Sequence, residues 1–423
     1  MREGYYAQAE PKIGKAAVDA LRELYDLYDE RVYIWYAKLW DPVIGGFYFS
    51  ESGRDAKGFL PDIESTVQAL TFLESSGITQ GKSYIEAAPE EMRKALSRFV
   101  KSLQDPEDGY FYHPQWGKNI ITPRRGRDIG WATSLLEALG EKADYPTALE
   151  RLSTGNKADS FPEYLLSIEK WREYLRTFDM VTKSYWSGNM LQSQARQIKA
   201  AGQEYVDELF KWLAEIQRAD NGLWEPQLNY ASVNGLMKLS LMYTSLGGFL
   251  PNAEAAMNSA IDVSMSDQEI VFCCQFYNPL VTMQNILYNM RKNGSAEKAE
   301  ALQQIIINRA PEFLRKTKEK VSTCLRPSGV FSYNPTAHSR LSQKAPVGLG
   351  LDEGDVNATS ICSTGIVRNV CIDLGIPRIP LYCKEDSELF YDIIKNSVQW
   401  EKIYEKPEWF DAAIDPAKLT ETY

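Results

Sequence analysis

Acidic side chains stand in front of several predicted helices and are the main supply of groups for chemistry in this sequence. They are Asp62, Glu64, Asp128, Glu225, Asp352, Glu353 and Asp355. Glycoside cleavage needs two carboxyl groups, one to protonate the leaving oxygen and one to activate water or attack the sugar. Asp62 and Asp355 are equally good helix N-caps, because each stands just before a helix start. Asp352 and Glu353 lie in a Gly-rich loop with less reason to cap, so we favour them as functional.

The chain contains two histidines, His113 and His338, and both fall in long turns before predicted helices. Imidazole titrates near neutral pH and suits proton transfer, so His113 is a candidate catalytic residue and His338 a candidate binding residue. Each histidine, taken alone, is equally well explained as a surface-loop residue. Two histidines without clustered carboxylates or thiolates do not indicate zinc, and the sequence predicts no metal and no cofactor.

A basic run stands out in an otherwise acidic sequence: Arg124, Arg125 and Arg127, with Lys118 nearby. Arg side chains bind carboxylate or sulfate through paired hydrogen bonds, which suits a uronate or another acidic sugar. The alternative is a solvated loop that neutralises Asp128 and other acids.

Aromatic and amide side chains gather at the predicted helix entries. Aromatic faces stack on sugar rings and also stabilise carbocations, so this pattern fits both carbohydrate and isoprenoid chemistry. The amides could hydrogen-bond sugar hydroxyls or cap helices, and the aromatics could equally fill a large core. The candidates for substrate binding are Tyr112, Trp116, Trp131, Tyr185, Trp186, Asn189, Trp224, Glu225, Asn229, Tyr230, Tyr277 and Asn278.

Helices of two kinds alternate along the chain and must position these groups. Charged amphipathic segments, typical of helices with one wet face, lie near 12–40, 88–104, 161–178, 203–218, 252–264, 297–321 and 386–404. Segments that mix small, polar and apolar residues, typical of helices surrounded by neighbours, lie near 62–75, 128–139, 187–200, 230–247, 276–291 and 356–374.

Gly-aromatic turns recur before several of the second kind, as in "GGFYFS", "DGYFYH", "NGLWEP" and "SGVFSY". Self-similarity at a period of tens of residues indicates stacked supersecondary units. Six outer–inner pairs predict an all-α fold: a single (α/α)6 toroid domain over residues 1–423, with short β-hairpin-like turns at one mouth. Loops that enter the inner helices would then converge on one central funnel.

The segment "PDIESTVQALTFLESSG" resembles the repeat of the prenyltransferase and squalene-cyclase superfamily, in which an acidic residue precedes a Thr at the start of an inner helix. "GDVNATSICSTG" fits the same repeat and places Asp355 and Thr359 opposite Asp62 and Thr66. The resemblance implies isoprenoid chemistry. The superfamily's protonating cyclases carry an Asp-x-Asp-Asp motif, however, and Asn357 replaces its central Asp here; the zinc ligands of the protein prenyltransferases find no match.

"DGYFYHPQW" followed by "RGRDIGWATSLLEALGE" is similar to the pattern of the unsaturated-glucuronyl hydrolases, which belong with six-hairpin glycosidases and polysaccharide lyases of the same toroid. "DPVIGGFYFS" resembles openings of sugar epimerases of this architecture, whose several active-site histidines are missing. These resemblances imply a carbohydrate-active enzyme.

The composition of the chain excludes some classes of binding partner. A net charge of −10 disfavours nucleic acid and anionic membranes, and six Cys without a CxxC pair suit a reducing compartment. No stretch approaches about 18 consecutive apolar residues, and residues 1–15 lack an apolar leader core. We therefore expect a soluble, cytoplasmic protein, unless a signal peptide has been removed, that acts on a small molecule or an oligosaccharide. The oligomeric state is left open.

Together these patterns predict a carbohydrate-active enzyme that cleaves glycosidic bonds, by hydrolysis rather than elimination, with acids of the 352–355 loop opposing Asp62, Glu64 or Asp128. One alternative is a polysaccharide lyase, in which Tyr112 or His113 is the base and Arg125 or Arg127 neutralises a uronate. The others are a terpenoid-cyclase or prenyltransferase-like enzyme and a non-catalytic toroid that binds a glycan or peptide.

Overall fold

The computed structural model describes residues 2–148, 150–151 and 162–415 of the chain. Helices dominate it, and the described residues form only two short sheets, β1–β2 and β3–β4, each of two strands. The strands are β1 (Trp40–Asp41), β2 (Gly46–Phe47), β3 (Leu341–Ser342) and β4 (Ala345–Pro346). The prediction of an all-α fold with short hairpins is confirmed.

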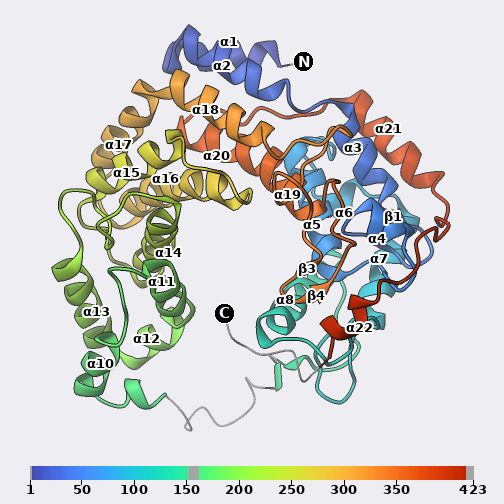
Figure 1. Ribbon diagram of the computed structural model, residues 1–423, viewed down its shortest axis with the longest axis horizontal. Helices are drawn as coiled ribbons and strands as arrows, with labels where there is room; N and C mark the ends of the chain where they lie inside the picture. Colours follow the sequence, from blue (N-terminus) through green and yellow to red (C-terminus); the bar gives the residue numbers. More distant parts are fainter. Residues whose placement is uncertain (1, 149, 152–161, 416–423) are drawn as a thin grey trace.

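Most of the helices with few charges contact one another in a continuous series, which we call the inner helices. They are α5 (Ile63–Ser76), α8 (Thr122–Ala138), α11 (Ser184–Ser193), α14 (Tyr230–Leu246), α16 (Cys274–Asn293) and the run of α19 (Val356–Ser360), η2 (Ile361–Gly365) and α20 (Ile366–Asp373). α11 contacts α14, α14 contacts α16, α16 contacts α20, α19 contacts α5, and α5 contacts α8. Figure 1 shows them along the inside of an open arc of helices.

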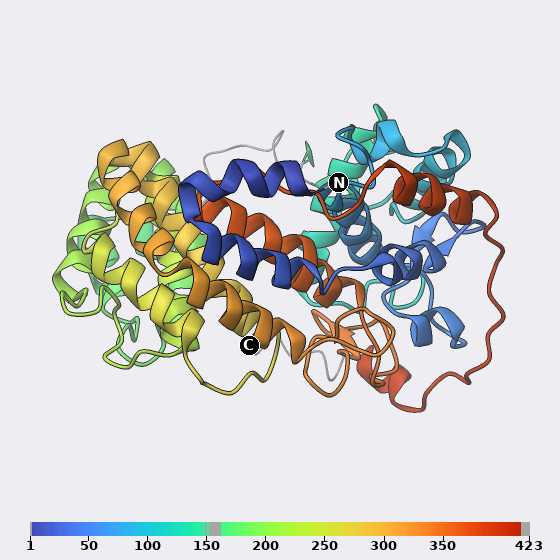
Figure 2. The same ribbon diagram turned by 90° about the horizontal axis from the view of Figure 1, so that it is seen from above.

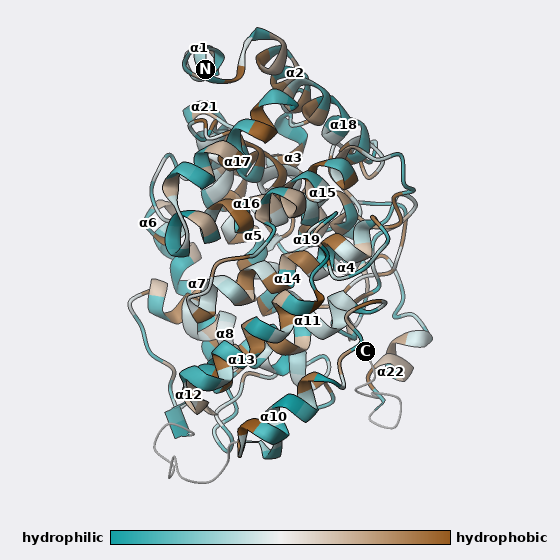
Figure 3. Ribbon diagram, turned by 90° about the vertical axis from the view of Figure 1, so that its left-hand side faces the viewer, coloured by the Kyte–Doolittle hydropathy of each residue, from teal (hydrophilic) through white to brown (hydrophobic). Residues whose placement is uncertain are grey.

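Charged amphipathic helices lie on the outside of this arc (Figure 1). They are α1 (Glu3–Ile13), α2 (Lys15–Tyr25), α3 (Glu30–Lys38), α7 (Glu90–Ser102), α10 (Ile168–Leu175), α13 (Gln203–Ile216), α15 (Ala253–Met265), α17 (Ala296–Asn308), α18 (Ala310–Ser322) and α21 (Lys384–Lys395). Hydrophilic residues are prominent on α10 and α13 in Figure 3. Shorter helices connect the layers: α4 (Glu51–Asp55), α6 (Tyr84–Ala87), η1 (Glu163–Leu165), α12 (Ala195–Ala201) and α22 (Trp409–Ala413).

Three predicted amphipathic segments differ from the structure in their boundaries. The segment near 12–40 is divided into helices, because Gly14 has a φ of 80° and Asp29 starts a new helix as its N-cap. The segment near 297–321 is also two helices, α17 and α18. The last helix ends at Lys395, and an extended strap leads on to α22 along one side of the molecule (Figure 2).

The two ends of the described chain are joined through the outer layer. α2 packs against α18, and α3 packs against α21. Arg2 donates a hydrogen bond to the carbonyl of Leu381 (2.6 Å), and the Tyr25 hydroxyl donates one to the carbonyl of Ile379 (3.0 Å). Figure 2 shows the N-terminal helices beside the C-terminal ones.

The repeated Gly-aromatic turns share one backbone geometry. Their glycines all have positive φ and are Gly45, Gly109, Gly222 and Gly329. In each turn the glycine N–H donates to a carbonyl three or four residues earlier, at 2.8–2.9 Å. Because only glycine adopts this conformation without strain, the sequence repeat is also a structural one.

Two inner helices begin in the same way, as their matching sequences predict. Asp62 caps α5, and Thr66 accepts a hydrogen bond from the N–H of Phe47 in the preceding turn (3.0 Å). Asp355 caps α19, and Thr359 accepts the same bond from the turn before its helix (3.1 Å). Asp62 and Asp355 therefore hold each helix start to its turn, which is a structural role.

Candidate functional site

A polar and aromatic pocket of about 220 Å³ lies among four inner-helix elements, α5, α8, α16 and the α19–α20 run; we call it the central pocket. Its lining is Val67, Gln68, Thr71, Ser75, Trp131, Tyr277, Asn357, Ser360, Ile361, Thr364, Gly365 and Arg368. Amide, hydroxyl and guanidinium groups thus surround two aromatic rings. This combination binds sugars, whose hydroxyls need hydrogen bonds and whose C–H faces pack on aromatic surfaces.

The amides of the central pocket form a short chain to an acid. Gln68 donates through Nε2 to Oδ1 of Asn357 (3.3 Å) and lies 3.4 Å from Oε1 of Glu64. The Oε1 atom of Gln68 is buried without a hydrogen-bond partner among the described residues. Buried polar atoms in folded proteins nearly always have a hydrogen-bond partner, so this acceptor is an exception within the pocket wall.

A π-helical turn, η2, forms part of the pocket wall between α19 and α20. Gly365 ends this turn, and a Cβ placed there would lie 2.9 Å from the ring of Tyr277. The glycine therefore lets the Tyr277 ring lie directly against the helix. Single π turns inside α-helices occur frequently at functional sites.

Arg124 is the centre of a buried ion-pair cluster behind the central pocket. Its side chain is fully buried and contacts three carboxylates: Asp62 (2.7 Å), Glu64 (2.6 Å) and Asp128 (2.8 Å). Burial opposes the charge on Arg124, but the three acids raise the pKa of its guanidinium above the usual value. Arg124 is therefore a structural cation, although the sequence predicted that it binds substrate.

The three acids of this cluster differ in their access to the pocket. Burial raises the pKa of Asp128 to about 7, and its side chain is 2% exposed, so it is enclosed rather than presented to a substrate. Glu64 also binds Arg127 (3.1 Å) and the Ser342 hydroxyl (3.0 Å), and it contacts Gln68 of the pocket. The Glu64 side chain is also buried, at 5% exposed, and it touches the central pocket through its contact with Gln68.

His113 and Trp116 stack on each other on the far side of Arg124, with ring centroids 4.2 Å apart and the guanidinium 5.2 Å from the Trp116 ring. His113 Nε2 lies 2.8 Å from the carbonyl of Pro61. Burial lowers the pKa of His113 to about 4, so it is neutral at physiological pH. Neither ring lines the central pocket. Both support the cluster.

The second predicted group of acids lies in the loop before α19, outside the central pocket. Glu353 pairs with His338 Nε2 (2.9 Å) and accepts from the N–H of Ser52 (3.1 Å). Burial acts to raise the pKa of Glu353, but His338 and Ser52 outweigh it and lower that pKa. Asp352 is 68% exposed and pairs with Arg326. These contacts fix the loop and do not place an acid at the pocket lining.

Asp355 is fully buried and accepts hydrogen bonds from the N–H groups of Ala358 (2.7 Å) and Tyr333 (2.9 Å). Burial raises the pKa of Asp355 to about 6 from 3.8, so the folded state binds this proton more tightly than the unfolded state. The stability it contributes is therefore present below about pH 4 and is lost as the pH rises through 6.

Asp355→Asn should remove this pH dependence, because Asn keeps the cap without titrating. Relative to the variant, we expect the wild-type free energy of unfolding to fall by roughly 1–3 kcal/mol between pH 4 and pH 7. Urea denaturation of both proteins across this range measures the difference. Parallel curves would show that the carboxyl titrates normally.

The remaining predicted binding residues divide by burial. Trp131 and Tyr277 line the central pocket, and Tyr185, Trp186 and Asn189 are exposed on α11. The others make hydrogen bonds outside the pocket. Trp224 Nε1 donates to the carbonyl of Leu213, Tyr230 accepts a hydrogen bond from Lys320, and Asn278 donates one to Asn234. Glu225 accepts from the N–H of Ser184 at the start of α11, and Asn229 is the N-cap of α14. Tyr112 donates to Asp108, and Arg125 lies over Tyr110.

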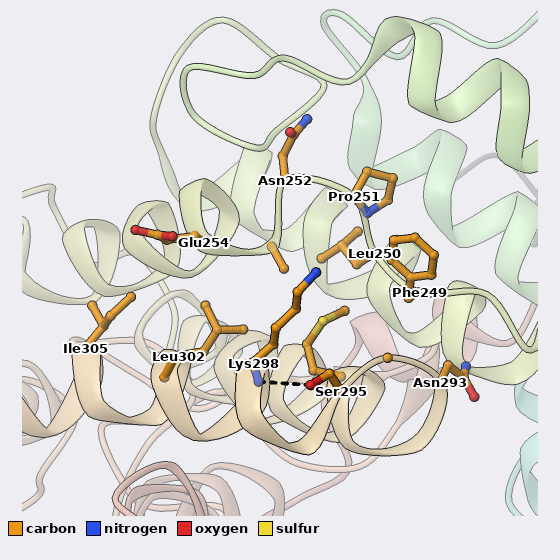
Figure 4. A pocket seen from close by; sticks show the side chains of 14 residues that line it. Phe249, Leu250, Pro251, Asn252, Glu254, Asn293, Ser295, Lys298, Leu302 and Ile305 are labelled. Atoms are coloured by element: carbon orange, nitrogen blue, oxygen red, sulfur yellow. Dashed lines mark hydrogen bonds between the residues drawn. The ribbon is translucent and has the colours of Figure 1, made fainter.

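A larger pocket, of about 780 Å³, lies at the other end of the inner helices, between the loop before α15, the end of α16 and α17. Figure 4 shows its walls, with Phe249, Leu250 and Leu302 facing the space and Lys298 extending across it. Its lining is mostly apolar, with Glu254 and Lys298 as its ionisable side chains. Size alone therefore does not make it the candidate active site.

Sequence reasoning missed the polar residues in the middle of the inner helices, because it concentrated on the helix entries. Gln68, Ser360 and Arg368 line the pocket, and Lys238 of α14 is the lone charge of its helix. An isolated basic residue in an otherwise uncharged, small-residue helix is the signal that could have found Arg368 and Lys238. Such a charge is costly in a core and so must face an open space.

Comparisons with protein-family models, with curated proteins and with solved structures found no match for this chain. Within the described part of the chain, no helix combines the length and the apolar sequence needed to cross a bilayer. No three His, Cys, Asp or Glu side chains of residues 2–148, 150–151 and 162–415 are grouped so that they could hold a metal ion. The function is therefore inferred from the geometry of the site.

Proposed function

We propose that this chain is a carbohydrate-active enzyme that cleaves glycosidic bonds in the central pocket of an (α/α)6 toroid. The contacts between inner helices support this arrangement: they run from α11 through α14 and α16 to α20, and from α19 through α5 to α8, so α8 and α11 are the two ends of the series. Outer helices pack against several inner ones: α7 against α8, α15 against α14 and α16, and α17 and α18 against α16. In such a toroid the inner faces share one central space.

The lining of the central pocket carries the functional proposal. Trp131 and Tyr277 supply aromatic surface, and Gln68, Asn357 and Ser360 supply hydrogen-bonding groups beside it. A long apolar pocket would instead favour an isoprenoid substrate, and the central pocket is not of that kind.

Hydrolysis is the first candidate reaction, and Glu64 is the carboxylate that we assign to it. Of the seven acids predicted at the helix entries, Glu64 is the one with a hydrogen bond to a pocket-lining residue among the described side chains. Arg124, Arg127 and Ser342 hold it in one orientation, which suits a group that activates water or attacks a sugar.

Elimination is the second candidate, because the pocket surroundings are richer in basic and phenolic groups than in free acids. Elimination needs a group that neutralises a uronate carboxylate, a role that the exposed Arg368 can fill. It also needs a base for the neighbouring C–H proton. Burial and the nearby Arg127 lower the pKa of Lys238, so a larger fraction of it is unprotonated at neutral pH than for an ordinary lysine, although Lys238 lies outside the lining of the central pocket.

Incubation with neutral and acidic oligosaccharides, followed by mass spectrometry, tests the proposal and separates the two reactions. Products that gain water identify hydrolysis, and unsaturated products identify elimination. If no oligosaccharide of the panel is cleaved, the proposed function is wrong.

Glu64→Gln should lower kcat/KM by about 100-fold or more, since Gln keeps the size of the side chain but neither takes up a proton nor attacks. Asp352→Asn is the matched control, because Asp352 is an exposed acid outside the pocket, and it should stay within about twofold of wild type. Steady-state kinetics on the cleaved oligosaccharide, with melting temperatures of both variants, decide the result. An E64Q enzyme with more than a tenth of wild-type activity would remove Glu64 from the reaction.

A further inference from the structure

The inner helices carry an excess of basic residues, although the chain has a net charge of −10. α11, α14 and α16 contain no Asp or Glu. The α19–α20 run contains one acid, Asp373, which is fully buried, and burial raises its pKa well above the usual value. These elements therefore present a positive surface, with Lys238, Arg291, Lys292 and Arg368 against one buried acid. α5, by contrast, carries Glu64 and Glu74 and no basic residue.

One face of α16 extends this positive surface beyond the central pocket. Tyr277 lines the pocket, and Tyr288 lies eleven residues further along the helix, which is about three full turns and returns to the same face. Tyr288 is 54% exposed, and Lys292 Nζ lies 5.7 Å from its ring centroid. A cation and an aromatic ring thus stand together on the continuation of the pocket wall.

Two further cation–aromatic pairs occur on the inner helices. Arg127 of α8 lies over the ring of Trp131 (5.2 Å), and Lys238 of α14 lies over the ring of Tyr185 of α11 (5.9 Å). Tyr185 is 44% exposed. Arg127 contributes to the lowered pKa of Lys238. The two pairs come from opposite arms of the arc, α8 on one and α11 and α14 on the other (Figure 1).

Each pair can bind one acidic sugar. The ring holds the cation in place by a cation–π contact and leaves its other N–H donors free for a carboxylate or sulfate. The exposed part of the ring offers apolar surface for the C–H face of the same sugar. Hydroxyl-binding amides in the adjoining pocket favour a glycan over a nucleic acid.

We propose that the inner-helix surface binds an acidic oligosaccharide along its length, with the pairs Arg127–Trp131, Lys238–Tyr185 and Lys292–Tyr288 each contacting one acidic sugar and Arg368 contacting the sugar in the central pocket. This proposal rests on the proposed function and names its substrate class. It assigns substrate contacts to residues distant from the helix entries.

Calorimetric titration of the full chain with an oligogalacturonate and with its methyl ester tests the proposal. The two ligands share one backbone and differ in charge, so the comparison isolates the carboxylates. We expect the acid form to bind at least about tenfold more tightly at low salt, and its affinity to fall as salt is added. Hyaluronan-derived and heparin-derived oligosaccharides, titrated in parallel, distinguish carboxylate from sulfate recognition.

The double variant Lys238→Gln/Lys292→Gln should weaken binding of the tightest acidic ligand by about tenfold or more. Lys298→Gln is the matched control, since Lys298 is an exposed lysine of the larger, 780 Å³ pocket, and the variant should bind as wild type does. Equal binding of the methyl ester, tighter binding of single-stranded DNA, or an unchanged double variant overturns the inference. Cleavage of neutral glycans alone would overturn it and leave the proposed function standing, whereas failure of every glycan to bind overturns both.

Discussion

Replacing Arg124 with Met is expected to lower the free energy of unfolding by more than about 4 kcal/mol at pH 7, because it leaves buried carboxylates without their cation. The Arg124 side chain is 0% exposed and is within 2.8 Å of Asp62, Glu64 and Asp128. Met fills a similar volume, so the loss is mainly electrostatic. Urea or thermal denaturation of the purified variant measures it.

The pH dependence of this variant distinguishes an electrostatic loss from a packing loss. Arg124 acts to lower the pKa of Asp128, so without Arg124 this pKa rises further, and the variant gains stability as the pH falls and Asp128 takes up a proton. We expect the deficit relative to wild type to shrink between pH 8 and pH 5. A deficit of the same size at both pH values would contradict the electrostatic explanation.

Arg125→Met is the matched control, since Arg125 is the adjacent residue but is only partly buried, with its guanidinium 4.9 Å from the ring of Tyr110. Loss of such a contact costs less than about 1 kcal/mol. If the two variants were equally stable, Arg124 would not hold the cluster together. Should R124M fail to fold, Arg124→Met/Asp128→Asn removes one unpaired acid and should recover part of the stability.

The helices of this fold can be predicted from the sequence because the patterns that indicate them are local. Charged faces mark the outer helices, small uncharged residues mark the inner ones, and Asp before a Thr-containing start marks two of the caps. Asp62 and Asp355 occupy the equivalent positions that their flanking sequences predict. Each of these signals lies within one or two turns of chain, so it needs no knowledge of distant contacts.

The site is less predictable because its contacts join distant parts of the chain. Arg124 and Asp62 are 62 residues apart, and no local pattern shows that they form a buried ion pair. An exposed Arg and a buried one look alike in sequence, so Arg124 was predicted to bind substrate. Similarly, the π turn at 361–365 depends on the fit of Tyr277 against Gly365, which packing rather than propensity decides.

The largest backbone effect is expected at the repeated turns, where Gly222→Ala should cost more than about 3 kcal/mol. Gly222 has a φ of 67°, and an added Cβ would lie 2.2 Å from the backbone N of Ala256 in α15. Backbone atoms of a packed helix move only if the helix moves. The substitution therefore separates α15 from the turn that it rests on.

Gly247→Ala is the matched control, because Gly247 also has positive φ (87°) but no atom lies within 4 Å of its added Cβ. It should cost about 1 kcal/mol, the strain of the left-handed conformation alone. The difference between the two variants, measured by urea denaturation, isolates the close approach of turn and helix.

At the other turns, the expected destabilisation by a Gly→Ala substitution depends on which atom the added Cβ would contact. Gly45 and Gly109 each approach a backbone carbonyl oxygen at 2.3 Å, so Ala there should be as damaging as at Gly222. Gly329 approaches the side chain of Arg31, at 2.8 Å, and this chain can bend aside at lower cost. If Gly329→Ala were as destabilising as Gly222→Ala, strain at φ rather than the close approach would explain all four glycines. If instead the ranking holds, direct backbone contact fixes two of these turns to outer helices, Gly45 to α7 and Gly222 to α15, and this constraint helps to place the inner helices that follow the turns.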